Sequence, residues 1–231
     1  MKKIAIIPAR GGSKRISKKN IKDFLGKPII FYSINAAIES GLFDEIMVST
    51  DDEQIAEFVK CFGAKVPFLR SKKNSDDFAT TIDVIEEVIS EYEKKGDVFD
   101  YTCCIYPCAP FVTSKTLKQS YFKLVDSKLD CVFPIVKYGH PIQRALKINS
   151  EGLTEMIAPE NMQLRSQDLE SRFHDLGQFY FFNTKKILKE RKLWTNNTGG
   201  VEVSEMESHD IDTIEDWHYA AMKYEFLRKL T

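Results

Sequence analysis

The sequence predicts an α/β fold in which a mostly parallel sheet is covered by helices on both faces. Apolar runs alternate with segments of helical period through the first 110 residues, and strand–helix–strand repeats of this kind form parallel sheets. The chain has 231 residues, of which 43% are hydrophobic, enough to bury a large core in one domain. Ligands of such sheets bind at the carboxyl ends of the strands, so the loops that follow the strands are the first candidates for a site.

Helices are expected between the apolar runs because isoleucines recur at helical spacing and glycines end the segments. The first helix is predicted from Pro28, which suits a first helical position, to Ser40, before Gly41. In the first half, strands are expected at 3–8, 45–49, 65–69 and 101–106. Further helices are expected at 53–62, with Asp51 or Asp52 as its cap, at 82–96 and at 113–126.

The second half begins with a strand at 131–138 and then changes character. From 139 to 176 the apolar period weakens, which indicates an excursion from the sheet with a hairpin around Gly152. The chain then returns through strands expected at 178–183 and 201–206 and a final helix at 213–230. We therefore expect a single domain, 1–231, with 139–176 as its one excursion.

Composition excludes several classes of protein. Lys and Arg total 33 against 34 Asp and Glu, whereas a nucleic-acid-binding chain is normally clearly basic. No apolar run approaches the ~18 residues of a membrane span. The opening apolar run ends at Ala9, so no signal peptide is expected, and the five cysteines are interpreted as reduced thiols. We expect a cytoplasmic protein that binds neither nucleic acid nor membrane.

A basic cluster follows the first predicted strand. Seven basic residues and one acid lie between Arg10 and Lys27. Gly11 and Gly12 allow backbone N–H groups to approach an anion, and Arg10 and Lys14 add positive charge, which is what a polyphosphate requires. The spacing is neither that of a Walker A loop nor that of a dinucleotide fingerprint. A solvated basic turn is the alternative.

An acidic cluster precedes the last predicted helix, with seven acids and no base between Glu202 and Asp216. Asp210 and Asp212 stand two apart, so in extended backbone both point to the same side and can hold Mg²⁺ together with substrate phosphates. The alternative is that Asp212 or Thr213 caps the helix, with Glu215 or Asp216 supporting a capping box. A cation cradle and a metal-binding pair are together the parts of phosphoryl or nucleotidyl transfer.

Several motifs resemble the CMP-sialic acid synthetase family in register from end to end. They span residues 7–15 (Ile-Pro-Ala-Arg-Gly-Gly-Ser-Lys-Arg), 19–21, 26–30, 48–52 and 210–217. Within the family, the pseudaminic acid cytidylyltransferase branch is resembled most, at 66–70, 105–107, 141–146, 165–169 and 174–180.

The resemblance implies a Rossmann-like nucleotidyltransferase fold with a small protruding dimerisation element, which 139–176 matches in position. It implies that CTP and an acidic nine-carbon sugar, pseudaminic acid, give the CMP-sugar and pyrophosphate, with Mg²⁺ and in a homodimer. Asp210, Asp212, Lys14 and Arg10 are the expected catalytic residues, and the aspartates bind the metal. The expected nucleotide-binding residues are Arg10, Gly11, Gly12, Ser13, Lys14, Lys19, Asn20, Arg70 and Thr80, with Thr81 as the alternative to Thr80.

The sugar carboxylate requires a cation, and Arg144, Arg165 and Arg172 are candidates, although each also suits an ion pair at a dimer interface or on the surface. Gln178 and Tyr180 alternate on one predicted strand, so both can face the sugar. Gln143 completes the expected sugar-binding set.

Three alternatives to this function stay open. The first is CMP or GMP activation of neuraminic or legionaminic acid, and the second is a non-catalytic nucleotide sensor. A nucleic-acid module that uses residues 10–27 is the third, but that segment lacks interleaved aromatic residues. An intact pair of Asp210 and Asp212 disfavours the sensor, because sensing does not require a metal for turnover.

Overall fold

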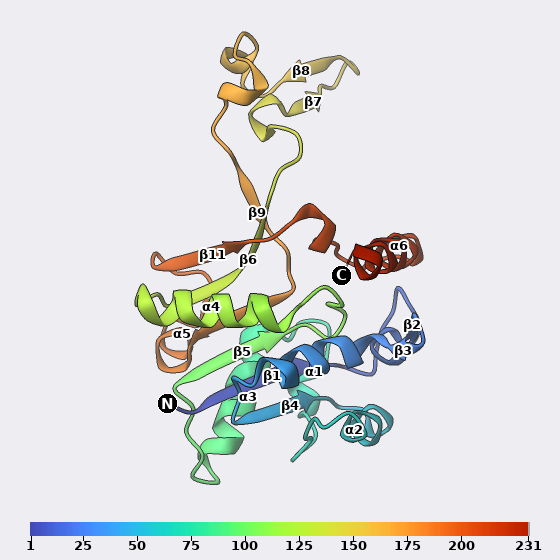
Figure 1. The fold of residues 1–231 in the computed structure, drawn as a ribbon, viewed down its shortest axis with the longest axis vertical. Coiled ribbons are helices and arrows are strands. Elements are labelled where there is room, and N and C mark those ends of the chain that lie inside the picture. Colours follow the sequence, from blue (N-terminus) through green and yellow to red (C-terminus); the bar gives the residue numbers. More distant parts are fainter. Residues whose placement is uncertain (231) are drawn as a thin grey trace.

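A seven-stranded sheet forms the centre of the computed structural model, which describes residues 1–230 (Figure 1). Its strands are β1 (Lys3–Pro8), β4 (Glu45–Ser49), β5 (Tyr101–Ile105), β6 (Cys131–Lys137), β9 (Phe173–Asp175), β10 (Phe179–Asn183) and β11 (Thr198–Glu202). The order is β11-β6-β10-β5-β1-β4, with β9 paired to β6 outside this path. All strands except β9 and β10 run in the same direction. The predicted mainly parallel α/β sheet is confirmed.

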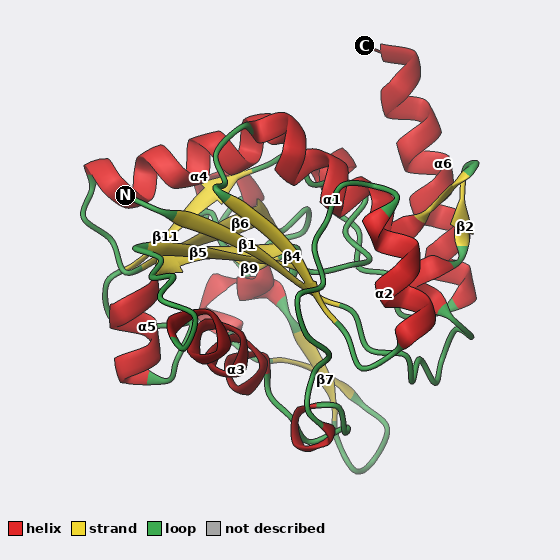
Figure 2. Cartoon of the chain, turned by 90° about the horizontal axis from the view of Figure 1, so that it is seen from below, coloured by secondary structure: helices red, strands yellow, loops and turns green. Residues whose placement is uncertain are grey.

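Helices cover both faces of this sheet (Figure 2). They are α1 (Ile29–Ser40), α2 (Glu53–Lys60), α3 (Thr81–Glu93), α4 (Ser114–Asp126) and α5 (Thr184–Glu190). The last helix, α6 (Ile214–Leu230), lies to one side and packs against Phe24 and α1. Successive side chains of β1 alternate between the layers: Ala5 and Ile7 pack in the core with α1 and α4, and Ile4 and Ile6 pack with α3 and α5. Within residues 1–230, no helix is long and apolar enough to cross a membrane.

The predicted helix ends agree closely with the structure where a cap was visible in the sequence. Gly41 ends α1 with φ 60°, a left-handed conformation that glycine adopts without a steric penalty. Asp52 caps α2 by accepting hydrogen bonds from the backbone N–H groups of Gln54 and Ile55. Pro28 immediately precedes α1 rather than lying inside it.

The expected strand at 65–69 was wrong. Lys65 makes a single parallel bridge to Met47, and no ladder continues from it. Pro67 has no N–H to donate, and the chain then turns so that the Arg70 N–H donates to the Thr50 carbonyl at 2.8 Å. The last strand was also misplaced, because β11 ends at Glu202 and residues 205–207 form a 3₁₀ turn.

Residues 139–176 project from the body of the molecule, leaving through β6 and returning through β9 (Figure 1). The expected hairpin is present as β7 (Leu146–Ile148) and β8 (Thr154–Met156), and Gly152 supplies the positive φ of its turn. Apolar side chains on this projection face solvent: Ile148 is 75% exposed and Ile157 61% exposed.

Candidate active site

A cleft of about 670 Å³ opens at the carboxyl ends of β1 and β5. Residues from both ends of the chain line it: Pro8, Arg10, Ser13, Lys14, Arg15, Ile16, Lys19, Asn20, Tyr106, Pro107, Cys108, Gly177, Tyr180, Asp210 and Asp212. The structure thus brings the basic loop (residues 10–19) and the aspartate pair into one cleft, at the sheet edge where ligands of parallel sheets bind.

The basic loop follows β1 directly, and one of its glycines is required by its surroundings. The Gly11 N–H donates to Asp51 Oδ1 at 3.0 Å, and a Cβ at Gly11 would lie 2.6 Å from Asp52 Oδ2. Gly12 has open space around it. The close approach to the start of α2 therefore needs glycine at position 11 but not at position 12.

Asn20 fixes the far end of the basic loop from a buried position. Its side-chain amide donates to the Arg10 carbonyl at 2.9 Å, and its oxygen accepts from the Cys108 thiol at 3.3 Å. Asn20 is therefore an anchor that holds Arg10 beside the end of β5.

The cations of the cleft are paired with carboxylates from two other segments. Arg10 contacts Asp77 at 2.8 Å, and Lys14 pairs with the same carboxylate. On the other side, Arg15 lies 2.7 Å and Lys19 3.9 Å from the carboxylate of Asp212. The cleft thus holds opposite charges close together, an arrangement suited to exchanging partners with a charged ligand.

The helix cap is made by a residue other than Asp212. The Thr213 hydroxyl accepts from the Asp216 N–H at 3.2 Å. In return, Asp216 Oδ2 accepts from the Thr213 hydroxyl at 2.8 Å and from the Thr213 N–H at 2.7 Å. These hydrogen bonds lower the pKa of Asp216. The capping box therefore leaves the Asp212 carboxylate directed toward the cleft.

The aspartate pair fits a divalent cation that takes part of its coordination from a substrate. Both carboxylates line the cleft, and hard oxygen ligands are what Mg²⁺ prefers. Among residues 1–230, no group of three or more His, Cys, Asp and Glu side chains is arranged to hold a metal ion. One or two carboxylates completed by water and phosphate oxygens are the usual Mg²⁺ arrangement.

Two tyrosines form the wall of the cleft on the β5 and β10 side. The hydroxyl of Tyr106 lies 2.9 Å from the Thr81 hydroxyl, and that of Tyr180 donates to Asp175. The rings meet edge to face at 6.1 Å. Burial raises the pKa of Tyr106 to about 12 and also raises the pKa of Tyr180, so both phenols stay protonated at neutral pH and act as hydrogen-bonding groups.

The comparisons with known proteins place this chain in a family. A family model described as cytidylyltransferase matches residues 4–230. The chain belongs to the cytidylyltransferase family. It is 41% identical over 224 residues to the pseudaminic acid cytidylyltransferase of Campylobacter jejuni serotype O:2, covering 97% of each. It is 32% identical over 222 residues to the CMP-N,N'-diacetyllegionaminic acid synthase of Legionella pneumophila, covering 94% of each.

A solved structure shares the fold of this cytidylyltransferase. The CMP:2-keto-3-deoxy-manno-octonic acid synthetase complexed with CTP aligns with a TM-score of 0.72 at 17% identity, over 99% of this chain and 100% of that one. This similarity concerns the fold, and it confirms the Rossmann-like nucleotidyltransferase architecture. The predicted family resemblance is confirmed by the sequence matches.

Five predicted residues of this cytidylyltransferase outside the projection do not line the cleft: Gly11, Gly12, Arg70, Thr80 and Gln178. Arg70 is 8% exposed, its Nε donates to the Ser49 hydroxyl at 2.9 Å, and burial lowers its pKa. Thr80 caps α3 in a capping box with Asp83. Gln178 is buried, and its amide donates to the Glu207 carbonyl at 2.8 Å. The side chains of Arg70, Thr80 and Gln178 are engaged in holding strands, α3 and the acidic segment together.

The remaining predicted sugar residues lie in the projection. Gln143 donates to the Glu170 carbonyl at 2.7 Å, Arg144 donates to the Leu164 carbonyl, and Arg165 pairs with Asp168 at 2.9 Å. None of the three lines the cleft of its own chain.

Asp77 and Asp175 are cleft-side residues that the sequence did not single out. Asp77 lies in a loop far from the basic loop in sequence, and Asp175 lies at the end of the projection. Asp175 lies inside the 174–180 segment that resembles the family, so the sequence carried a signal for its position but assigned it no role. Asp77 had no such signal, since its pairing with Arg10 depends on the tertiary structure.

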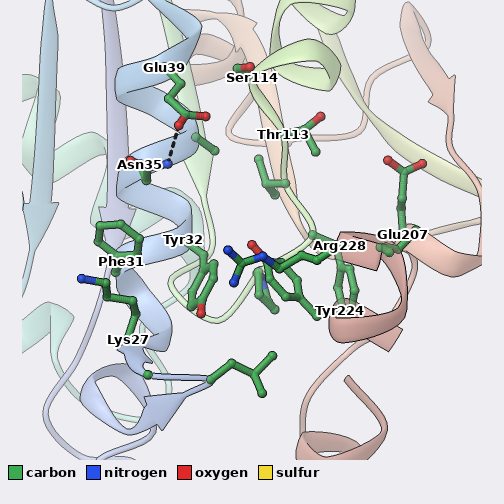
Figure 3. Close-up of a pocket in the computed structure, with 17 residues that line it drawn as sticks. Lys27, Phe31, Tyr32, Asn35, Glu39, Thr113, Ser114, Glu207, Tyr224 and Arg228 are labelled. Carbon is green, nitrogen blue, oxygen red and sulfur yellow. Dashed lines mark hydrogen bonds between the residues drawn. The ribbon is translucent and has the colours of Figure 1, made fainter. Parts of the chain in front are cut away.

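A second cavity of about 530 Å³ lies between α1 and α6 (Figure 3). Figure 3 shows Tyr32 of α1 facing Tyr224 and Arg228 of α6. Its floor is aromatic and its polar groups are scattered. It contains neither the basic loop nor the aspartate pair, so it is not the candidate active site.

Proposed function

We propose that this protein transfers CMP from CTP to pseudaminic acid and releases pyrophosphate. The observation that carries the proposal is the single cleft shared by the basic loop and by Asp210 and Asp212. The 41% identity to a pseudaminic acid cytidylyltransferase over nearly the whole chain supports the choice of sugar. Legionaminic and neuraminic acids are the alternatives, since enzymes named for them are 32% and 31% identical.

The proposed reaction is an in-line attack of the anomeric hydroxyl of the sugar on the α-phosphorus of CTP. Arg10 and Lys14 neutralise the charge that builds on the leaving pyrophosphate. Gly11 and Gly12 allow the backbone to approach the phosphates, and Ser13 and Lys19 complete the phosphate contacts. Arg70 and Thr80, whose side chains hold Ser49 and the start of α3, are proposed to support the nucleotide from beside the cleft.

Asp210 and Asp212 are the proposed ligands of Mg²⁺. Bound there, the ion would neutralise phosphate charge and lower the pKa of the attacking hydroxyl. Arg15, which pairs with Asp212 at 2.7 Å, is then released to a phosphate oxygen. Tyr180, which lines the cleft, is the proposed sugar contact. Gln178, immediately before the same strand, supports it by holding the Glu207 carbonyl.

We also propose a homodimer in which the projection of one protomer completes the cleft of its partner. Gln143, Arg144 and Arg165 then contact the sugar bound by the other protomer, with a guanidinium for its carboxylate. The exposed apolar side chains of the projection, such as Ile148 at 75% exposure, suit burial in such an interface.

The dimer proposal has a sharp test in mixed variants. Asp212→Asn inactivates the cleft of its own chain. Arg165→Ala leaves that cleft intact but removes the guanidinium that its projection supplies to the partner's cleft. Each variant alone is expected to be strongly impaired, and their mixture to regain about one quarter of the wild-type rate. A mixture no more active than the two variants apart, or a monomer by light scattering, overturns it.

The proposed reaction is tested by offering CTP, GTP and UTP with pseudaminic, legionaminic or neuraminic acid, with and without Mg²⁺, and following pyrophosphate release. We expect release with CTP and pseudaminic acid and only in the presence of the metal. The location proposed for this reaction is the cytoplasm, since all five cysteines are free thiols, as a reducing compartment keeps them. Pyrophosphate release with GTP in place of CTP would replace the proposed nucleotide. Release with legionaminic or neuraminic acid but not with pseudaminic acid would replace the proposed sugar.

A further inference from the structure

Asp77 pairs with the two cations of the cleft, Arg10 and Lys14, that the proposed function assigns to the phosphates of CTP. Its Oδ1 accepts from Arg10 at 2.8 Å, and its other oxygen accepts from Lys14. Arg10 and Lys14 are the two cations assigned above to the leaving pyrophosphate. A single carboxylate therefore bridges the pair that the ligand needs.

We propose that Asp77 is an internal counter-anion that competes with the triphosphate for Arg10 and Lys14, and thereby weakens CTP binding and speeds the release of pyrophosphate. The inference rests on the proposed function, because it takes the same cations as the phosphate site. It adds a residue that sets the affinity of that site for polyphosphates.

The loop that carries Asp77 is held in place by its own hydrogen bonds. Asp76 Oδ1 accepts from the N–H groups of Phe78 and Ala79 at 2.9 and 2.8 Å, an Asx turn that fixes the backbone beside Asp77. Arg10 also donates to the Asp76 carbonyl at 3.2 Å. At the start of the loop, the Ser71 N–H and hydroxyl donate to Glu87 of α3 at 2.7 and 2.8 Å. The carboxylate is thus presented to the cations by a structured turn.

The contact is built to be exchanged. The side chains of Asp77, Arg10 and Lys14 are 44%, 39% and 74% exposed, and ion pairs this exposed are weak. Hydrogen bonds from Lys14 and Arg10 lower the pKa of Asp77, so the competitor is ionised at neutral pH. A triphosphate brings several negative charges to the same two cations, whereas Asp77 brings one, so the triphosphate displaces the carboxylate.

The competition has opposite consequences for substrate and product steps. Because the pair with Asp77 must break before phosphate binds, part of the intrinsic affinity for CTP is lost. The same carboxylate recaptures Arg10 and Lys14 as pyrophosphate leaves. Removing it is expected to tighten the binding of both polyphosphates and to leave binding of the uncharged nucleoside unchanged.

The test compares Asp77→Asn with the matched variant Asp76→Asn. Both remove one negative charge from adjacent positions of one loop, and an asparagine at 76 keeps the oxygen that the Asx turn requires. Dissociation constants for CTP, pyrophosphate and cytidine are measured by calorimetry in EDTA, and thermal melting checks the fold.

Asp77→Asn is expected to bind CTP and pyrophosphate about two- to tenfold more tightly than wild type, the range for losing weak competing ion pairs, and to bind cytidine unchanged. Product inhibition by pyrophosphate rises correspondingly. Unchanged or weaker CTP binding overturns the inference, as does equal tightening by Asp76→Asn, which would reduce the effect to general charge. Failure of the wild-type protein to bind CTP at all would instead contradict the proposed function.

Discussion

The guanidinium of Arg15 and the carboxylate of Asp212 lie 2.7 Å apart, although they come from opposite ends of the chain. The pair joins the basic loop after β1 to the segment before α6, across the cleft that both segments line. The Asp212 carboxylate is therefore positioned by Arg15, a cation that can move from the carboxylate to a phosphate when the ligand binds. Its expected role as a metal ligand and its present role as an ion-pair partner use the same atoms.

Replacing Asp212 by asparagine is expected to lower kcat by orders of magnitude while the fold is retained. The amide removes the negative charge that a metal ligand supplies, and the helix cap is unaffected because Thr213 and Asp216 form it. Pyrophosphate release measures the rate, and circular dichroism checks the fold. Glu215→Gln, a neighbouring acid outside the cleft-lining set, is the control and should stay active. Full activity of Asp212→Asn with Mg²⁺ would remove the metal role.

Thr213→Ala tests the cap itself. Loss of an N-cap hydroxyl is expected to cost about 1 kcal/mol of unfolding free energy, and the melting temperature should fall by about 2–4 °C for a chain of this size. Differential scanning calorimetry measures both values. Because Asp212 stays in place, the variant should keep most of its activity. An unchanged melting temperature would show that the capping box contributes nothing to α6.

The acid side of the stability profile should depend on Asp83. Hydrogen bonds from Thr80, helped by Arg191, lower the pKa of this carboxyl. A group whose pKa is lower in the folded chain stabilises it above the unfolded value, about 3.9, and that stability is lost as the pH falls through the lower folded value.

Urea unfolding of Asp83→Asn at pH 6 and pH 3 checks this dependence. The variant should be less stable than wild type at pH 6, and the two should converge toward pH 3. Asp126→Asn, which removes an exposed carboxylate of α4, should follow the wild-type profile. An equal loss for Asp83→Asn at both pH values would assign the effect to packing.

The sequence predicted elements best where local chemistry decides them. Gly41, Asp52 and the alternation of apolar residues mark ends and faces that depend on neighbours in the chain, and these agree with the structure. The segment 65–69 failed because its apolar character resembles a strand, whereas Pro67 and the bond from Arg70 to Thr50 end its pairing.

The site was predictable in part for a similar reason. The carboxyl ends of parallel strands meet at one edge, so the basic loop could be placed there from sequence alone. No local pattern shows that the chain before the last helix brings Asp210 and Asp212 to the basic loop. Only the family resemblance predicted that these residues share one site. The pairing of Asp77 with Arg10 joins two loops whose geometry no local pattern encodes.

Gly11 and Gly12 offer the clearest contrast between neighbouring positions. A Cβ at Gly11 would lie 2.6 Å from Asp52 Oδ2 and 2.9 Å from Asp52 Cβ, whereas a Cβ at Gly12 meets nothing within 4 Å. Asp52 caps α2, so it cannot move away without releasing the helix start. Gly11→Ala is therefore expected to cost about 1–3 kcal/mol, the range for inserting a methyl group into a packed site.

Denaturant unfolding and CTP calorimetry on both variants measure these effects. Gly11→Ala should lose stability and bind CTP at least several-fold more weakly, because the strain displaces the backbone that carries Arg10. Gly12→Ala should keep its stability. Any loss of CTP affinity in this variant would then show that the added methyl group keeps the phosphates away from the backbone of the loop. Equal stability of the two variants would mean that the loop relaxes around the added methyl group, and the steric requirement at Gly11 would then be wrong.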